Sequence, residues 1–151
     1  TPVGEEVRGK IEYKKDLTAI VAAHGVPYVA QASPSHWMDL MKKVQKALKI
    51  EGPTFINVIA PCPRGWRSEP DESIRLARLA VETYYWPLYE IENGVWKLNL
   101  KPRKKPVEEY LKPQKRFAHL FKPENKPMLE DLQRMVDERW EALLKKVGGQ
   151  Q

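Results

Sequence analysis

The chain of 151 residues is 42% hydrophobic, carries a formal net charge of +6 at pH 7 and contains one cysteine. One cysteine cannot form an internal disulfide, and no apolar run approaches the roughly 18 residues that span a bilayer. Composition therefore argues against a disulfide scaffold and a membrane-spanning chain. We expect a soluble, cytoplasmic chain with one sizeable core.

The first half of the sequence has the pattern of a βαβ unit. Two strands that a helix joins within about 30 residues run parallel, with a right-handed crossover. The predicted elements are a helix over residues 14–24 that ends at Gly25, a strand over residues 26–32, a helix from about residue 36 to 49 with a hydroxyl N-cap in residues 33–35, and a strand over residues 54–60.

The helix over residues 36–49 is amphipathic, with apolar side chains on one face and lysines on the other. We expect the apolar face to pack on the sheet and the lysines to face water. The apolar positions are Trp37, Leu40, Met41, Val44, Ala47 and Leu48, and the lysines are Lys42, Lys43, Lys46 and Lys49.

The strand over residues 54–60 stops close to the only cysteine. Its mostly apolar sequence predicts a strand that is covered on both faces, as in a parallel sheet. Pro61 and Pro63 end the ladder, because proline donates no backbone hydrogen bond. Cys62 therefore lies in a stiff turn at the carboxyl end of a strand, the end where open α/β sheets carry their chemistry.

After the cysteine the sequence predicts a helix that begins between Ser68 and Pro70 and ends near Tyr84. Alternating strands over residues 88–92 and 95–99 then flank Asn93-Gly94, which is typical of a two-residue hairpin with a primed turn.

The remaining sequence is a basic arm and a helix. Residues 101–122 carry eight basic and two acidic residues, so this segment accounts for the net charge of the whole chain. The segment is rich in proline and cannot build a core of its own, so we expect it to lie along another surface. The final helix, over residues 128–147, has an apolar stripe suited to a core or an interface.

Cys62 admits three interpretations. A lone cysteine is most often a small buried hydrophobe. A rigid turn instead favours a metal or cluster ligand, which would need further ligands from outside this chain. A nucleophile paired with His24, His36 or His119 is the third possibility, but no sequence feature places a histidine against Cys62, and no phosphate loop or paired metal-ligand motif is present.

The basic arm supports an alternative function of a different class. Tyr110, Phe117 and Phe121 alternate with lysines and arginines, a pattern that could bind single-stranded nucleic acid by stacking and phosphate contact. A solvated or subunit-embracing tail is the interpretation that the composition favours. The alternative is therefore a non-catalytic interaction module whose arm binds nucleic acid or a partner protein.

Six segments of the sequence carry a family resemblance. They are KKD (14–16), AHGVPYVAQAS (23–33), VQKAL (44–48), GP (52–53), APCPRGW (60–66) and RLARLAVET (75–83). In this order and spacing they resemble the C-terminal half of the beta subunit of pyruvate:ferredoxin oxidoreductase, or pyruvate synthase. The similarity covers residues 1 to about 90, and the rest resembles the variable tails of these subunits more loosely.

The resemblance implies an α/β fold in two parts. Residues 1–100 would be the C-terminal part of a thiamine-diphosphate-binding domain with a parallel sheet and a β-hairpin, and residues 101–151 a basic, proline-rich arm and C-terminal helix for subunit assembly. It also implies an enzyme that decarboxylates pyruvate, passes electrons through [4Fe-4S] clusters to ferredoxin and delivers acetyl to coenzyme A. The implied partners are alpha, gamma and delta subunits, with no membrane or nucleic acid.

The resemblance gives Cys62 a role as the fourth ligand of the [4Fe-4S] cluster nearest the thiamine. The other three cysteines, and the motifs for thiamine diphosphate and Mg²⁺, would lie upstream of Thr1, and residues 1–2 match the close of that cofactor segment. The chain thus resembles a fragment or one piece of a split subunit, and we expect no activity from it alone. The APCPxGW form resembles the pyruvate branch more than the 2-oxoglutarate branch.

Overall fold

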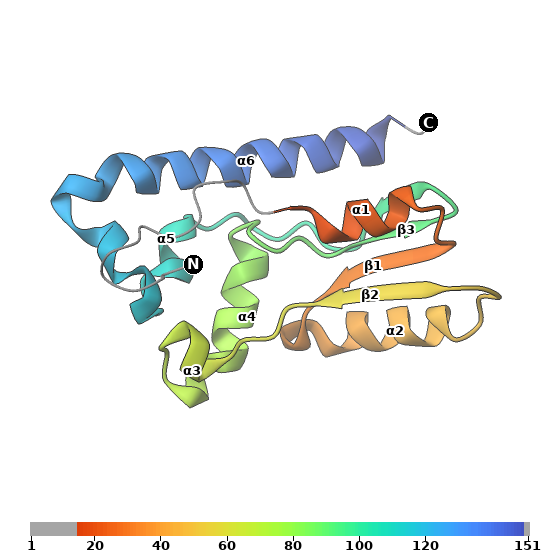
Figure 1. Cartoon of the computed structure of the whole chain (residues 1–151), viewed down its shortest axis with the longest axis horizontal. Helices are drawn as coiled ribbons and strands as arrows, with labels where there is room; N and C mark the ends of the chain where they lie inside the picture. The colour runs from red at the N-terminus through yellow and green to blue at the C-terminus, as the bar shows by residue number, and fades with distance from the viewer. Residues whose placement is uncertain (1–14, 150–151) are drawn as a thin grey trace.

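The computed structural model describes residues 15–149; the predicted irregular lead-in over residues 1–13 and the match at residues 1–2 lie outside them (Figure 1). The helices are α1 (Leu17–Ala23), α2 (Trp37–Ala47), α3 (Pro63–Trp66), α4 (Ser73–Glu82), α5 (Val107–Leu111) and α6 (Lys126–Gly148). The strands are β1 (Tyr28–Ala32), β2 (Thr54–Val58), β3 (Tyr89–Glu92) and β4 (Val95–Leu98). Four 3-10 turns are η1 (Pro34–His36), η2 (Pro70–Glu72), η3 (Lys115–Phe121) and η4 (Pro123–Asn125).

The strands form a mixed sheet in the order β2-β1-β3-β4. β1 pairs with β2 in parallel, with Val29 opposite Phe55, and with β3 in antiparallel orientation, with Val29 opposite Ile91. The predicted α/β fold with a parallel pair and a β-hairpin is confirmed. The two strands of the hairpin are also part of this sheet, because β3 pairs with β1. Tyr89 and Ile91 of β3 extend the apolar face to which Val29 belongs.

Several local predictions are confirmed. Gly25 has a φ of 73°, directly after the C-cap residue of α1. Asn93 and Gly94 have φ values of 49° and 81°, as a primed hairpin turn requires. The hydroxyl cap is displaced: the Ser33 side chain accepts the Ser35 N–H and so caps η1, whereas α2 begins without a side-chain cap.

Helices cover both faces of the sheet (Figure 1). α1 and α6 lie on one face, where an apolar cluster contains Val29, Ile91, Trp140 and Leu143. α2 lies against β1 and β2 on the opposite face. The parallel pair of strands therefore lies between two helical layers.

The prediction for α2 was wrong in part: Lys42 and Lys49 are exposed as expected, but the helix is turned about its axis so that Lys43 does not face water. Lys43 is only 2% exposed and faces the sheet, while Trp37 and Leu48 are 64% and 82% exposed. The sheet face beneath α2 explains this orientation: Glu90 is buried there and accepts a hydrogen bond of 2.7 Å from the Tyr28 hydroxyl. A buried carboxylate requires cations, so α2 turns Lys43 and Lys46 toward the sheet.

The ion pairs under α2 agree with this explanation. Lys46 Nζ lies 3.4 Å and Lys97 Nζ 3.2 Å from a Glu90 carboxylate oxygen. Lys43 Nζ donates to the Gln31 carbonyl at 2.8 Å and to Asp39 at 2.7 Å. Burial lowers the pKa of Lys43, opposed by its bond to Asp39. For Glu90, burial alone would raise the pKa, but the Tyr28 hydrogen bond and the two lysines outweigh it and lower the pKa.

The prediction that residues 54–60 form a strand covered on both faces is confirmed in part: α1 and α2 contact β2 from the two faces, but the strand is shorter than predicted and lies at an edge of the sheet. β2 ends at Val58, with one further ladder bond from the Ile59 N–H to the Ala32 carbonyl at 3.2 Å. Among the described residues β2 is an edge strand, and both Thr54 and Val58 are exposed. An apolar sequence at an open edge looks the same as an apolar sequence in the middle of a sheet.

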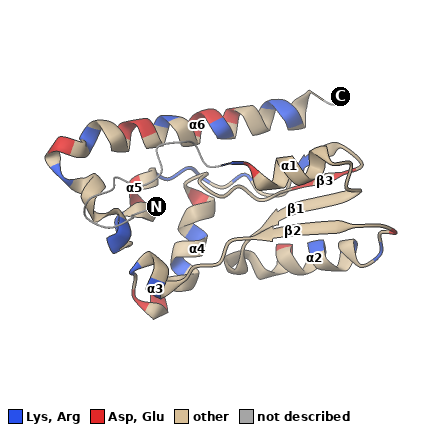
Figure 2. Ribbon diagram, in the orientation of Figure 1, with Lys and Arg blue, Asp and Glu red and all other residues tan. Residues whose placement is uncertain are grey.

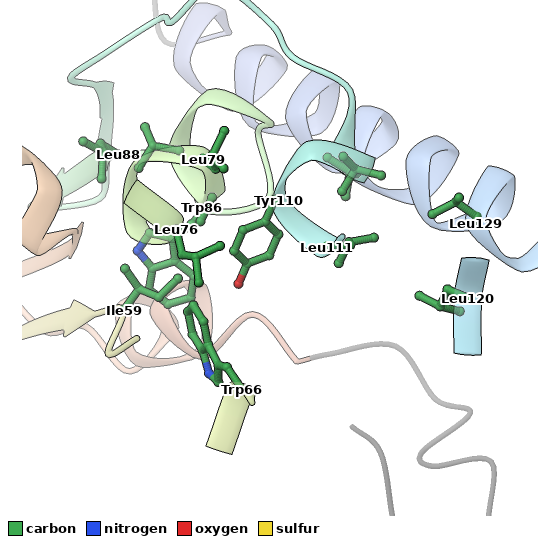
Figure 3. Packing of buried hydrophobic residues seen from close by; sticks show 14 residues of the cluster. Ile59, Trp66, Leu76, Leu79, Trp86, Leu88, Tyr110, Leu111, Leu120 and Leu129 are labelled. Atoms are coloured by element: carbon green, nitrogen blue, oxygen red, sulfur yellow. The ribbon is translucent and has the colours of Figure 1, made fainter. Parts of the chain in front are cut away.

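A second apolar cluster lies at the carboxyl end of the parallel strands (Figure 3). It joins α4 to residues of the predicted basic arm, in which Val107, Tyr110, Leu111 and Leu120 are buried. The arm thus packs on this chain's own surface. The division into a domain over residues 1–100 and an assembly arm over residues 101–151 stays a prediction.

The final helix is confirmed, with bounds of Lys126–Gly148. Its apolar stripe contributes to both clusters, because Leu129 and Val136 belong to one and Trp140 and Leu143 to the other. Within residues 15–149, no helix is both long enough and apolar enough to cross a membrane.

Candidate functional site

Cys62 lies just beyond the carboxyl end of β2, as predicted, and its side chain is exposed. It is the N-cap residue of α3, a single turn that begins at Pro63. The Gly65 N–H donates to Cys62 Sγ at 3.3 Å, and the Trp66 N–H donates to the Cys62 carbonyl at 2.8 Å. These bonds and the flanking prolines fix the direction of the thiol, which is exposed and therefore not the buried hydrophobe of the first interpretation.

Trp66 holds the Cys62 turn against the rest of the molecule. Its buried ring meets Tyr110 edge-on, with the ring centroids 6.0 Å apart (Figure 3). The Arg116 guanidinium lies over the same ring, 4.5 Å from its centroid. The Arg67 carbonyl also accepts the Lys115 N–H at 3.2 Å. The turn is therefore braced by α5 and η3, which lie far along the chain.

Basic side chains surround this turn. Arg64 and Arg67 are exposed on either side of Trp66, and Arg116 covers its ring. Figure 2 shows both basic and acidic positions beside α3 and along α4.

None of the three histidines pairs with Cys62. His24 ends α1, before β1 begins, and so lies at the opposite end of the parallel strands. His119 is exposed in η3. His36 follows β1 at the same end as Cys62, but its ring is hydrogen-bonded to Ser35. The geometry gives no support to a cysteine–histidine nucleophile.

A polar chain at the end of β1 was missed by the sequence prediction. The hydroxyls of Ser33 and Ser35 are 2.9 Å apart, and Ser35 Oγ lies 3.0 Å from His36 Nδ1. Both serines are buried. Burial lowers the pKa of His36, and the charge of Arg78 lowers it further. The lowered pKa favours the neutral imidazole at the edge of the sheet where Cys62 lies. The only sequence signal for these hydrogen bonds was the Ser-Pro-Ser-His segment, which we interpreted as a helix cap.

The described residues contain one cysteine that could serve as a cluster ligand. Across residues 15–149, no group of three or more His, Cys, Asp or Glu side chains could hold a metal ion. Cys62 fits the role of a single cluster ligand, because its sulfur is accessible and its direction is fixed. The other ligands would have to reach it from outside these residues.

The aromatic residues of the basic arm do not form a stacking platform. Tyr110 is 1% exposed, and Arg116 lies 4.5 Å from the Phe117 ring centroid. Several lysines of the arm pair with acidic residues: Lys104 with Asp137, and Lys105 with Glu82. These contacts count against nucleic-acid binding, which needs exposed rings and unpaired cations.

Comparison with known proteins identifies the class. The chain is 50% identical over 145 residues to pyruvate synthase subunit PorB of Thermotoga maritima, an alignment that covers 95% of this chain and 45% of that protein. It is 51% identical to PorB of Methanocaldococcus jannaschii over 95% of this chain and 47% of that protein. It is 47% identical to ketoisovalerate oxidoreductase subunit VorB of Pyrococcus furiosus over 96% of this chain and 46% of that protein. No protein-family model matches the chain.

These identities place the chain among the 2-oxoacid oxidoreductase subunits that include PorB and VorB. The resemblance to the pyruvate synthase beta subunit is thereby confirmed, and PorB is the particular subunit to which the chain is similar. The chain spans about half the length of the curated relatives it matches.

Proposed function

We propose that this chain is part of the beta subunit of a 2-oxoacid:ferredoxin oxidoreductase that converts pyruvate and coenzyme A to acetyl-CoA and CO₂, with the two electrons passing to ferredoxin. The observation that carries the proposal is the identity of about half to PorB over nearly the whole chain, together with an accessible thiol at the end of a parallel strand. The implied partners are alpha, gamma and delta subunits and ferredoxin.

Cys62 is the residue through which the chain would act. As fourth ligand of a [4Fe-4S] cluster, it would hold one iron while three other cysteines come from the part of the subunit that this chain does not include. The cluster would supply one-electron transfer between the thiamine adduct and ferredoxin. The chain's own contribution is to fix the sulfur through the Gly65 N–H and to keep Arg64 and Arg67 nearby.

Thiamine diphosphate and Mg²⁺ have no proposed ligands among the described residues. Their motifs would belong to the same absent part of the subunit. Pyruvate is the proposed substrate because the APCPxGW segment resembles the pyruvate branch more than the 2-oxoglutarate branch. The similar identity to VorB makes ketoisovalerate the comparison of choice in any activity assay.

The test is Cys62→Ser in the assembled complex. We expect each beta subunit to lose about four iron atoms and the matching electron paramagnetic resonance signal, because a hydroxyl is a poor cluster ligand. Pyruvate-dependent ferredoxin reduction should fall with the iron content. Asp71→Asn, at an exposed position nearby, is the matched control and should leave both unchanged. Full iron content and activity in Cys62→Ser would remove this residue from the ligand set.

A further inference from the structure

The guanidinium of Arg116 has a fixed position beside the turn that carries Cys62. It packs on two aromatic rings and lies 4.5 Å from the centroids of both Trp66 and Phe117. Its Nε and Nη2 donate to Gln114 Oε1 at 2.9 and 2.6 Å. A planar, forked cation suits both the stacking and the paired hydrogen bonds, whereas a lysine could not make them together.

Gln114 gives this arrangement a rigid base. Its side chain is fully buried, and its amide nitrogen donates to the Tyr110 carbonyl of α5 at 2.6 Å. The backbone N–H of Gln114 donates to the Leu111 carbonyl at 3.0 Å. A buried amide whose oxygen and nitrogen are both hydrogen-bonded has little freedom to rotate. Arg116 is therefore positioned by α5 through Gln114.

The charge of Arg116 is not neutralised by an ion pair within residues 15–149. Its hydrogen bonds go to an amide, and the acidic residues that follow α3 have other partners. Glu69 pairs with Lys115 at 3.4 Å. Glu72 pairs with Arg75. Burial lowers the pKa of Arg116, but arginine stays protonated in proteins, so the positive charge is permanent.

Trp66 connects the position of Arg116 to the sulfur of Cys62. The Trp66 N–H donates to the Cys62 carbonyl at 2.8 Å and closes the turn in which the Gly65 N–H donates to Cys62 Sγ at 3.3 Å. Because α3 is a single turn, a shift at its Trp66 end also moves the N–H that faces the sulfur. Such a hydrogen bond and a nearby charge are two of the features that set the potential of an iron–sulfur cluster.

We propose that Arg116 is a positioning residue for Cys62 and that its charge raises the reduction potential of the [4Fe-4S] cluster that Cys62 would hold. The reduced cluster carries one negative charge more than the oxidised cluster, so a fixed cation nearby stabilises the reduced form. Arg116 would act through Trp66 and through its electric field, without binding iron. The inference rests on the proposed function, because it needs Cys62 to be a cluster ligand.

The test is a redox titration of this cluster in the assembled complex, followed by electron paramagnetic resonance. The cluster is identified by the signal that Cys62→Ser abolishes. Arg116→Met keeps an apolar side chain over Trp66 but removes the charge, so at a fixed potential the ratio of reduced to oxidised cluster should fall at least about fivefold. Arg116→Lys keeps the charge and should change this ratio by less than about twofold.

Lys112→Met is the matched control, because it removes an exposed cation of the same segment. Water and salt screen that charge, so the ratio should change by less than about twofold. An unchanged ratio in Arg116→Met, or equal changes in Arg116→Met and Lys112→Met, would overturn the proposal. Equal changes in Arg116→Met and Arg116→Lys would also overturn it, because the shape of the side chain and not its charge would then be responsible.

Hydrogen exchange in the 151-residue chain tests the positioning role without a cluster. The Trp66 amide should exchange at least about threefold faster in Arg116→Met than in Lys112→Met, and equal rates would overturn this role even if Arg116→Met fails to assemble. Iron retained in Cys62→Ser would refute the proposed function but leave the exchange result intact. Iron lost in Cys62→Ser with no shift in Arg116→Met would refute the present inference alone.

Discussion

The helices α2 and α4 have similarly amphipathic sequences but opposite surroundings. α4 buries Leu76, Leu79 and Val81 in a cluster that this chain completes with α5, η3 and α6. α2 buries Lys43 and exposes Trp37 and Leu48. The difference shows that an amphipathic pattern identifies two faces of a helix, and that the neighbouring residues decide which face is covered.

The largest expected difference in stability is between two leucine-to-alanine substitutions, one on each helix. Leu76→Ala removes a side chain that is 0% exposed and should lower the free energy of unfolding of the chain by about 2–5 kcal/mol. Leu48→Ala, at a position 82% exposed, should change it by less than about 0.5 kcal/mol. Urea denaturation of the two variants measures both values. Comparable losses would mean that α2 is covered within this chain.

A smaller effect concerns the polar side of α2. Glu90→Gln keeps the side-chain shape but removes the charge that Lys46 and Lys97 face, and should cost about 1–3 kcal/mol at pH 7. Glu92→Gln is the matched control: its carboxylate is 2.7 Å from Lys46 Nζ but 44% exposed, so the cost should be below about 1 kcal/mol.

The pH dependence of stability provides a second test of the role of the Glu90 carboxylate. Because the folded-state pKa of Glu90 is lowered, its contribution is present above its ordinary value of 4.5 and is lost as the pH falls through the folded-state pKa. Glu90→Gln should therefore flatten the loss of stability in acid below that pH. An unchanged acid profile would contradict the assignment.

The smallest expected effect is that of His36, which packs near α4. Its folded-state pKa lies below the ordinary value of 6.5, so the unfolded chain binds the proton more readily and stability falls as the pH drops below that value. His36→Gln should remove this pH dependence of the free energy of unfolding, while the pH dependence due to Glu90 remains at lower pH. Urea denaturation at pH 7, 6 and 5 measures the effect. If the pH dependence persists in His36→Gln, another group is responsible.

The sequence allowed accurate prediction of elements that depend on local chemistry. Asn93-Gly94 defines its hairpin because both positions tolerate positive φ, and Gly25 ends α1 for the same reason. The α6 stripe was predictable because its residues repeat at helical spacing over many turns. The position of Cys62 after β2 followed from the flanking prolines.

Features that depend on distant residues were not predictable from local pattern. Glu90 pairs with Lys46 of α2, and it accepts a hydrogen bond from the hydroxyl of Tyr28, a residue 62 positions earlier in the chain. The open edge of β2 depends on strand order, which alternation and hydrophobicity do not encode. The buried side chains of the basic arm find their partners in α4 and α6, so composition alone suggested an exposed segment.

The bracing of the Cys62 turn has a consequence for the order of events during synthesis. Trp66 completes its packing only against Tyr110 and Arg116, which leave the ribosome later than the turn itself. Until those residues have folded back, the thiol is attached to a loop without its final support. The turn that carries Cys62 therefore reaches its final support only once α5 and η3 have been synthesised and have packed against Trp66.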